Sequence, residues 1–160
     1  MKGFNVESDT IIVTGMKEAL SKLSQISEPK AVERRVRAAL NAAAKPVLAS
    51  AKSNAPVSTG TLKHALKARV AKKRNGQLSA RIGAANQKFE VTDTKTGKKQ
   101  VRNPRYYLHL VELGNYGRKG KPFLSSALES NVSNCPTIIR DSLAKSLRRL
   151  EKKARKAAAK

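Results

Sequence analysis

The sequence is poor in cysteine, aromatic residues and acids. Its 160 residues include a single cysteine, Cys135, no tryptophan, and three residues each of phenylalanine and tyrosine. One cysteine cannot form a disulfide within the chain, which implies a reducing compartment or indifference to redox conditions. We expect Cys135 to be a small, buried or half-buried side chain. The apolar residues are mainly Ala, Leu and Val, and this composition favours closely packed helices.

Long apolar runs are also missing. No stretch approaches the roughly 18 apolar residues of a membrane span. The first ten residues, MKGFNVESDT, lack the apolar core of a signal peptide. We therefore expect no membrane partner, and a protein that is made in the cytoplasm and stays there or in an assembly formed there.

Acidic residues are few, and the chain is strongly basic. Lys and Arg number 34 against 11 acidic residues, which gives a net charge of +23, and most of the excess follows residue 60. A field of this kind attracts nucleic acid, acidic protein surfaces or anionic lipid, without distinguishing among them.

The sequence shows no constellation of catalytic or metal-binding residues. His64 and His109 have no His or Cys three or four residues away to share a metal ion. Glu112, in LVELGNYG, is the one acid that a buried proton-transfer role would suit, but pairing with an arginine or capping a turn is favoured. We predict no catalytic residue, no metal and no cofactor.

The first half of the chain predicts one strand followed by helices. TIIVTG at 10–15 predicts a strand and residues 16–27 a short amphipathic helix. Residues 30–53 form the strongest helical pattern, with Ser27 as its cap and Pro29 in its first turn. An i,i+4 pair of Glu33 with Arg37 lies on its polar side. Pro46 predicts a kink, or a division into two helices.

The second half predicts hairpins and further helices. Residues 67–84 alternate around Asn75-Gly76, which predicts a hairpin with a type I′ turn and a basic outer face. Residues 92–104 predict a long hairpin or flexible loop, and 105–114 a strand or a short helix. Residues 123–132 and 136–160 predict helices, the last ending as a frayed helix or a disordered tail.

These elements predict an α+β fold. A long kinked helix and a C-terminal helix would pack on a small antiparallel sheet that carries an extended hairpin or loop. Residues 1–150 would form a single domain, followed by a basic C-terminal tail at 151–160.

The stretch APVSTGTLKHAL at 55–66 has two interpretations. Its hydroxyls and glycine could hold an anion at the start of a helix. A Walker loop, however, needs a second glycine and a lysine that are missing here. We therefore favour a structural turn, in which Pro56 stops the long helix, Gly60 permits the turn, Thr59 or Thr61 caps the next helix, and Leu62 docks into the core.

Four short stretches then occur in a recognisable order: VTGMKEAL at 13–20, APVSTGTL at 55–62, YLHLVELG at 107–114 and PFLSSAL at 122–128. This series resembles the tail-component family of tailed bacteriophages, the gene-product-ten-like proteins of the neck that act in head–tail joining or tail completion. The resemblance covers roughly residues 11–135. Asn115 departs from the family pattern, which commonly has Thr there.

The resemblance implies a structural protein of the virion, assembled in the host cytoplasm. Its subunits would form a ring in the neck, between the head connector and the tail tube, and the genome would pass through the lumen. The implied partners are other copies of the chain, the head connector or stopper protein, the tail terminator or tail tube protein, and genomic DNA. Six copies are favoured over twelve, since tail tubes commonly have six-fold symmetry.

Within that ring we expect two groups of contact residues. The ring or partner interface would include Tyr106, Tyr107, Glu112, Phe123 and Leu124, with Phe123 also anchoring the preceding loop by its burial. Acidic partners or DNA phosphates would meet Lys72, Lys73, Arg74, Arg118, Lys119 and Lys121.

Two other classes of function remain open. A non-specific nucleic-acid-binding basic protein agrees with the net charge, but few aromatic residues and no RNA-binding signature weaken it. An enzyme, such as a nuclease using Glu112 and His109, is the least favoured because acids are so scarce.

Overall fold

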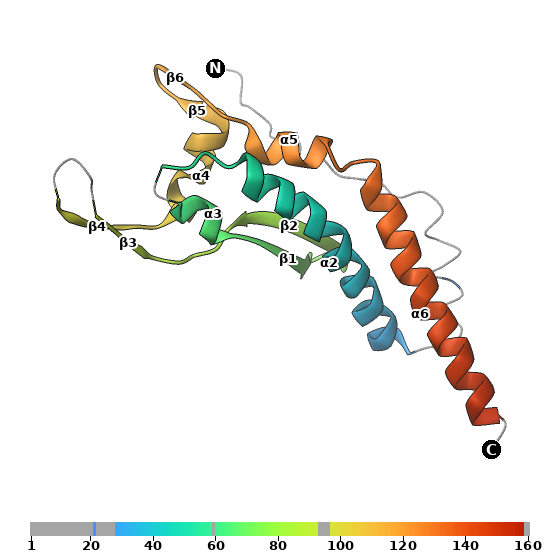
Figure 1. Ribbon diagram of the computed structural model, residues 1–160. Helices are drawn as coiled ribbons and strands as arrows, with labels where there is room; N and C mark the ends of the chain where they lie inside the picture. The colour runs from blue at the N-terminus through green and yellow to red at the C-terminus, as the bar shows by residue number, and fades with distance from the viewer. Residues whose placement is uncertain (1–20, 22–27, 59, 93–96, 159–160) are drawn as a thin grey trace.

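The computed structural model describes residues 21, 28–58, 60–92 and 97–158 (Figure 1). The strand expected at 10–15 lies outside them, as does all of the helix expected at 16–27 except Ser21. The described helices are α2 (Pro29–Asn54), α3 (Thr61–Ala65), α4 (Pro104–Leu113), α5 (Phe123–Glu129) and α6 (Asn134–Ala158). The described strands are β1 (Leu66–Lys72), β2 (Leu78–Ala84), β3 (Phe89–Thr92), β4 (Lys99–Arg102), β5 (Gly114–Asn115) and β6 (Arg118–Lys119). The α+β class is therefore confirmed.

Helix α2 is the central element, and it is longer and less interrupted than the sequence suggested. It begins at Pro29 with Glu28 in the cap position, and Ser27, the expected cap, lies outside the described residues. The helix continues through Pro46 to Asn54 as one element, which excludes the division into two helices. A proline inside a helix costs about 3 kcal/mol. Packing on both sides of α2 offsets that cost.

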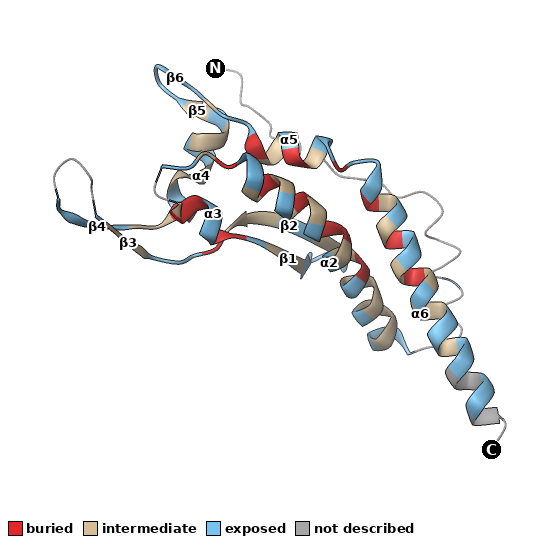
Figure 2. Cartoon of the chain, in the orientation of Figure 1, coloured by how far each residue is buried: buried red, intermediate tan, exposed pale blue. Residues whose placement is uncertain are grey.

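The core forms on two sides of α2. The β1–β2 hairpin packs on one side, and α5 and α6 pack on the other (Figure 1). Helix α6 packs mainly against α2. Ala39, Ala43, Val47 and Ala51 are buried along α2, as their spacing predicts. These small side chains let the neighbouring elements approach closely. Figure 2 shows the buried residues concentrated where α2 faces α5 and α6.

The β1–β2 hairpin has the predicted strands but a different turn. The strands are antiparallel, with Leu66 opposite Ala84 and Lys72 opposite Leu78. The amide of Gly76 donates to the carbonyl of Lys73 at 2.9 Å, and Gly76 has a φ of +80°. A type I′ turn also needs a positive φ at Asn75, and among the described residues only glycines have one. The connection is therefore a three-residue loop ending in a left-handed glycine.

Each of the remaining ambiguous segments adopts one of its two alternatives. Strands β3 and β4 form an antiparallel hairpin with Phe89 opposite Arg102, and this hairpin, which we call the arm, projects from the body (Figure 1). Residues 104–113 form helix α4 rather than a strand. Helix α6 continues through the basic end of the chain to Ala158. The division at residue 150 into a domain and a tail stays a prediction.

Candidate functional site

The turn between α2 and α3 places Gly60 at a sharp corner. Gly60 has a φ of +72° and occupies the cap position of α3, which has no side-chain cap bond. Thr61 therefore does not cap α3 as expected; its hydroxyl lies 3.0 Å from the hydroxyl of Tyr107 on α4. Leu62 is 5% exposed and packs in the core. Thr59 lies outside the described residues.

Glu112 ties the end of α4 to the start of α5. Its Oε2 accepts a hydrogen bond from the Leu124 amide at 3.0 Å, and its Oε1 accepts from the Ser125 amide and hydroxyl, both at 2.9 Å. These amides belong to the first turn of α5, where a negative charge is favourable. The carboxylate therefore caps a helix, which was one of the expected structural roles. We remove it from the proposed ring interface because its oxygens are already engaged.

Two glycines let the β5–β6 hairpin fold back against the end of α4. A Cβ on Gly114 would lie 2.6 Å from the carbonyl oxygen of Arg118, and one on Gly120 would lie 2.4 Å from the carbonyl oxygen of Glu112. Side chains do not tolerate such distances, so the close approach requires glycine at both positions. The amide of Lys121 then donates to the carbonyl of Val111 at 2.8 Å.

This folding encloses an open hollow of about 760 Å³, which we call the basic hollow. Its cationic residues are Arg102, Arg118, Lys119 and Lys121. Its other lining residues are Pro56, Ser58, Gly60, Thr61, Leu62, Tyr107, Leu110, Val111, Asn115 and Tyr116. The hollow thus combines described residues of the turn before α3 with the basic residues at 118–121, and none of its described lining residues is acidic.

The expected basic contacts fall into two separate places. Lys72 pairs with Glu33 at 2.8 Å, and Glu33 also pairs with Arg37 at 3.0 Å, as its i,i+4 spacing predicted. The ammonium group of Lys72, followed by the guanidinium of Arg37, lowers the pKa of Glu33. Lys72 therefore fastens β1 to α2, and we remove it from the proposed partner contacts.

Lys73 and Arg74 are exposed at the turn of the β1–β2 hairpin. In Figure 1 that turn lies near the start of α2, far from the β5–β6 hairpin that carries Arg118 and Lys119. The fold thus separates two basic groups that the sequence analysis treated together.

The expected interface residues differ in accessibility. Tyr106 is 70% exposed, whereas Tyr107 and Leu124 are half-buried. Phe123 is 3% exposed and belongs to the core. Its aromatic side chain is therefore not accessible to a partner, and we remove it from the proposed interface. Leu110 and Leu113, which were not predicted as interface residues, are 40% and 67% exposed. Tyr106, Leu110 and Leu113 follow i,i+4,i+7 spacing, and this pattern could have indicated that they share one face of a helix.

Other chemistry has little support in the described part of the chain. No three His, Cys, Asp or Glu residues there come close enough to hold a metal ion. No described helix has the length and apolar character needed to cross a membrane. Cys135 is buried, its Sγ lies 3.7 Å from the carbonyl oxygen of Ala43, and burial raises its pKa. As expected, this cysteine packs as a small core residue.

Comparison with known proteins supplies the family. Residues 16–114 match the model of the HK97-gp10-like family, whose description is bacteriophage HK97-gp10, a tail component. No curated protein and no solved structure matches the chain. The family match covers more than half of the sequence and includes the stretches at 55–62 and 107–114. The chain therefore belongs to the HK97-gp10-like family of bacteriophage tail components, which are structural proteins of the virion.

Proposed function

We propose that this protein forms a ring in the neck of the phage particle. The ring joins the head connector or stopper protein to the tail terminator or tail tube, and the genome passes through its lumen. The role is structural and involves no catalytic step. The observation that carries the proposal is a pair of unlike surfaces that are exposed among the described residues of one subunit: the projecting arm and the exposed face of α4.

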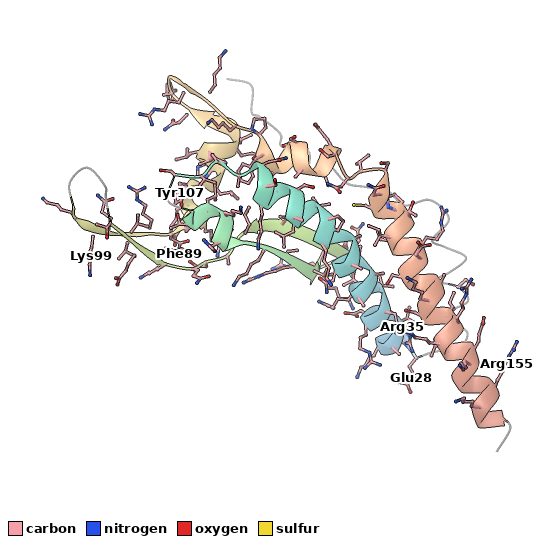
Figure 3. The ribbon with its side chains drawn as sticks, viewed as in Figure 1. Glu28, Arg35, Phe89, Lys99, Tyr107 and Arg155 are labelled. Carbon is pink, nitrogen blue, oxygen red and sulfur yellow. The ribbon has the colours of Figure 1, made fainter. Side chains whose placement is uncertain are left out.

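The arm needs a neighbour to become rigid. Its two strands pair over four residues each, and its main packing is between these strands. An isolated two-stranded hairpin is marginally stable in water. Phe89 and Val91 share one face of the arm, while Val101 is 64% exposed on the other. Figure 3 shows Lys99 far out on the arm, well away from Tyr107 on α4.

Helix α4 offers the complementary surface. Tyr106 and Leu113 leave about two thirds of their surface exposed on one side of this ten-residue helix. An arm that docks on α4 of the next copy makes a heterologous contact, and such contacts give a ring when the rotation between successive copies closes. Six copies remain favoured over twelve by analogy with tail tubes.

The charge of the subunit makes an apolar contact necessary. Each copy carries a net charge of +23, so neighbouring copies repel one another. Salt screens that repulsion, and the ring should therefore become more stable as ionic strength rises. Non-specific binding of nucleic acid changes in the opposite direction, because salt weakens phosphate contacts.

Light scattering coupled to gel filtration tests the ring in solution. Val101→Glu and Leu113→Glu should each shift the purified protein from a ring to a monomer. Val132→Glu is the matched control, since Val132 is an exposed valine, at 48%, in the connection between α5 and α6. A monomeric wild type at every salt concentration, or equal effects of all three variants, would argue against the arm-to-α4 contact.

Particles grown without the protein test its place in assembly. Full heads and finished tails that stay apart support the joining role. Ala substitution of Lys73 and Arg74, the exposed basic pair at the β1–β2 turn, should weaken joining if that turn contacts a partner. Two results together would instead support the nucleic-acid-binding alternative. The wild-type protein would be a monomer that binds free DNA and releases it as salt rises, and heads and tails would join normally in phage that lack the protein.

A further inference from the structure

We propose that the basic hollow binds an acidic peptide segment of another virion protein, with one apolar side chain of that segment seated on the apolar residues of the hollow. This inference deepens the proposed function by identifying a contact through which the ring would hold a neighbouring protein. It rests on that function for the setting, whereas the binding itself requires only one folded subunit.

The charged lining selects for carboxylates. Arg102 comes from the base of the arm, Arg118 and Lys119 from β6, and Lys121 from the segment before α5. Separate parts of the chain thus bring four cations to one hollow, and none of the described residues that line it is an acid. Arginine pairs with carboxylates through two parallel hydrogen bonds, and complementary charge speeds and orients docking.

The apolar lining favours a peptide over DNA. Leu62 and Val111 are buried and half-buried, and Leu110 is 40% exposed, so the hollow offers apolar surface to a bound side chain. Its volume of about 760 Å³ lies in the range of about 300–1,000 Å³ in which small ligands are held. A DNA backbone has no apolar side chain to place there, and contacts to phosphates need only the cations.

The acidic segment belongs to another protein rather than to the described part of a second copy. Glu33 is paired with Lys72 and Arg37, and the Glu112 carboxylate caps α5. The described residues contain no run of neighbouring acids. The arm, which could reach a neighbouring copy, carries Lys98, Lys99 and Arg102 against Glu90 in its described part, so that part offers the hollow no acidic segment.

Fluorescence anisotropy with a labelled acidic probe tests the proposal. The probe is the hexapeptide Asp-Glu-Leu-Phe-Glu-Glu, titrated with the purified full chain at fixed salt. The double variant Arg118→Glu, Lys119→Glu should weaken its binding roughly tenfold or more, because two attractive charges become repulsive. The matched control is Lys73→Glu, Arg74→Glu, which changes the net charge equally at the β1–β2 turn and should weaken binding by only about twofold.

A second pair of measurements tests the apolar contact. Replacing Leu-Phe in the probe by Ser-Ser should weaken binding to wild type, and Leu110→Ser should remove most of that difference between the two probes. Equal weakening by the two double variants would overturn the proposal, because it would show attraction by net charge alone. Tighter binding of a duplex DNA probe than of the peptide would also overturn it.

Two further arms of the experiment separate the possible failures. A peptide of residues 4–9 of this chain, FNVESD, carries two acids and no basic residue. Tighter binding of FNVESD than of the hexapeptide would overturn the assignment to another protein and give the hollow to a second copy. The monomeric variant Leu113→Glu should still bind the hexapeptide as wild type does. A protein that forms the ring but does not bind the peptide would refute the peptide site and leave the proposed function standing. A protein that binds the peptide but never forms a ring would refute the ring and leave the peptide site standing.

Discussion

Removal of the Glu112 carboxylate tests how α4 is fastened to α5. Glu112→Ala leaves the amides of Leu124 and Ser125 without their acceptor, along with the Ser125 hydroxyl. A helix cap contributes about 0.5–2 kcal/mol, and a hydrogen bond to a charged group about 1.5–3 kcal/mol. All three bonds share one carboxylate, and water replaces part of them because the site is only half-buried. We therefore expect the free energy of unfolding to fall by about 2–3 kcal/mol.

Urea and thermal unfolding, followed by circular dichroism at one protein concentration, measure this loss. For a chain of this size the expected fall in Tm is roughly 4–12 °C. Glu112→Gln keeps one acceptor oxygen and should lose about half as much free energy of unfolding as the alanine variant. Glu129→Ala is the matched control, because Glu129 is an exposed acid at the other end of α5, and its loss should stay within about 0.5 kcal/mol. Equal losses at Glu112 and Glu129 would refute the capping role.

Three further predictions concern the corner, one ion pair and the cysteine. Gly60→Val should lower the free energy of unfolding by about 1–2 kcal/mol, because a branched residue is strained at a φ of +72°, while Gly60→Asn should cost less; unchanged stability in urea titrations would show an unstrained corner. Lys72 and then Arg37 lower the pKa of Glu33, so the stability from Glu33 is present at neutral pH and is lost as pH falls through that lowered pKa. Glu33→Gln should therefore flatten the fall of Tm between pH 5 and pH 3, and an unchanged acid profile would contradict this pairing. Burial raises the pKa of Cys135, so iodoacetamide should alkylate it slowly in the native protein and quickly in urea, whereas rapid native alkylation would contradict its burial.

Local sequence signals predicted most of the elements. The apolar stripe of α2 was readable because buried alanines and valines recur at helical spacing. The nature of residues 105–114 was ambiguous by periodicity, yet the preceding residues carried a helix-start signal. The side chain of Asn103 accepts from the Arg105 amide at 3.1 Å, and Pro104 fills the first turn of α4.

The errors arose where contacts between distant segments decide the outcome. Lys72 was expected to meet a partner, but the hairpin crosses α2 and brings it to Glu33, 39 residues away. Phe123 was expected both to be buried as an anchor and to contribute to the interface; the packing of α5 on α2 confirms the burial and leaves the side chain almost no accessible surface for a partner. The basic hollow could not be predicted because Gly60 and Arg118 come to line one hollow only when the β5–β6 hairpin folds back on α4.

Electron cryomicroscopy of phage particles tests the central claim most directly, by comparing wild type with Val101→Glu and with the control Val132→Glu. The proposed ring predicts a closed density of this subunit between the connector and the tail tube in wild type and in the control. It predicts separate full heads and finished tails for Val101→Glu. Joined particles with a normal neck in Val101→Glu, or this subunit found elsewhere in the virion, would contradict the account.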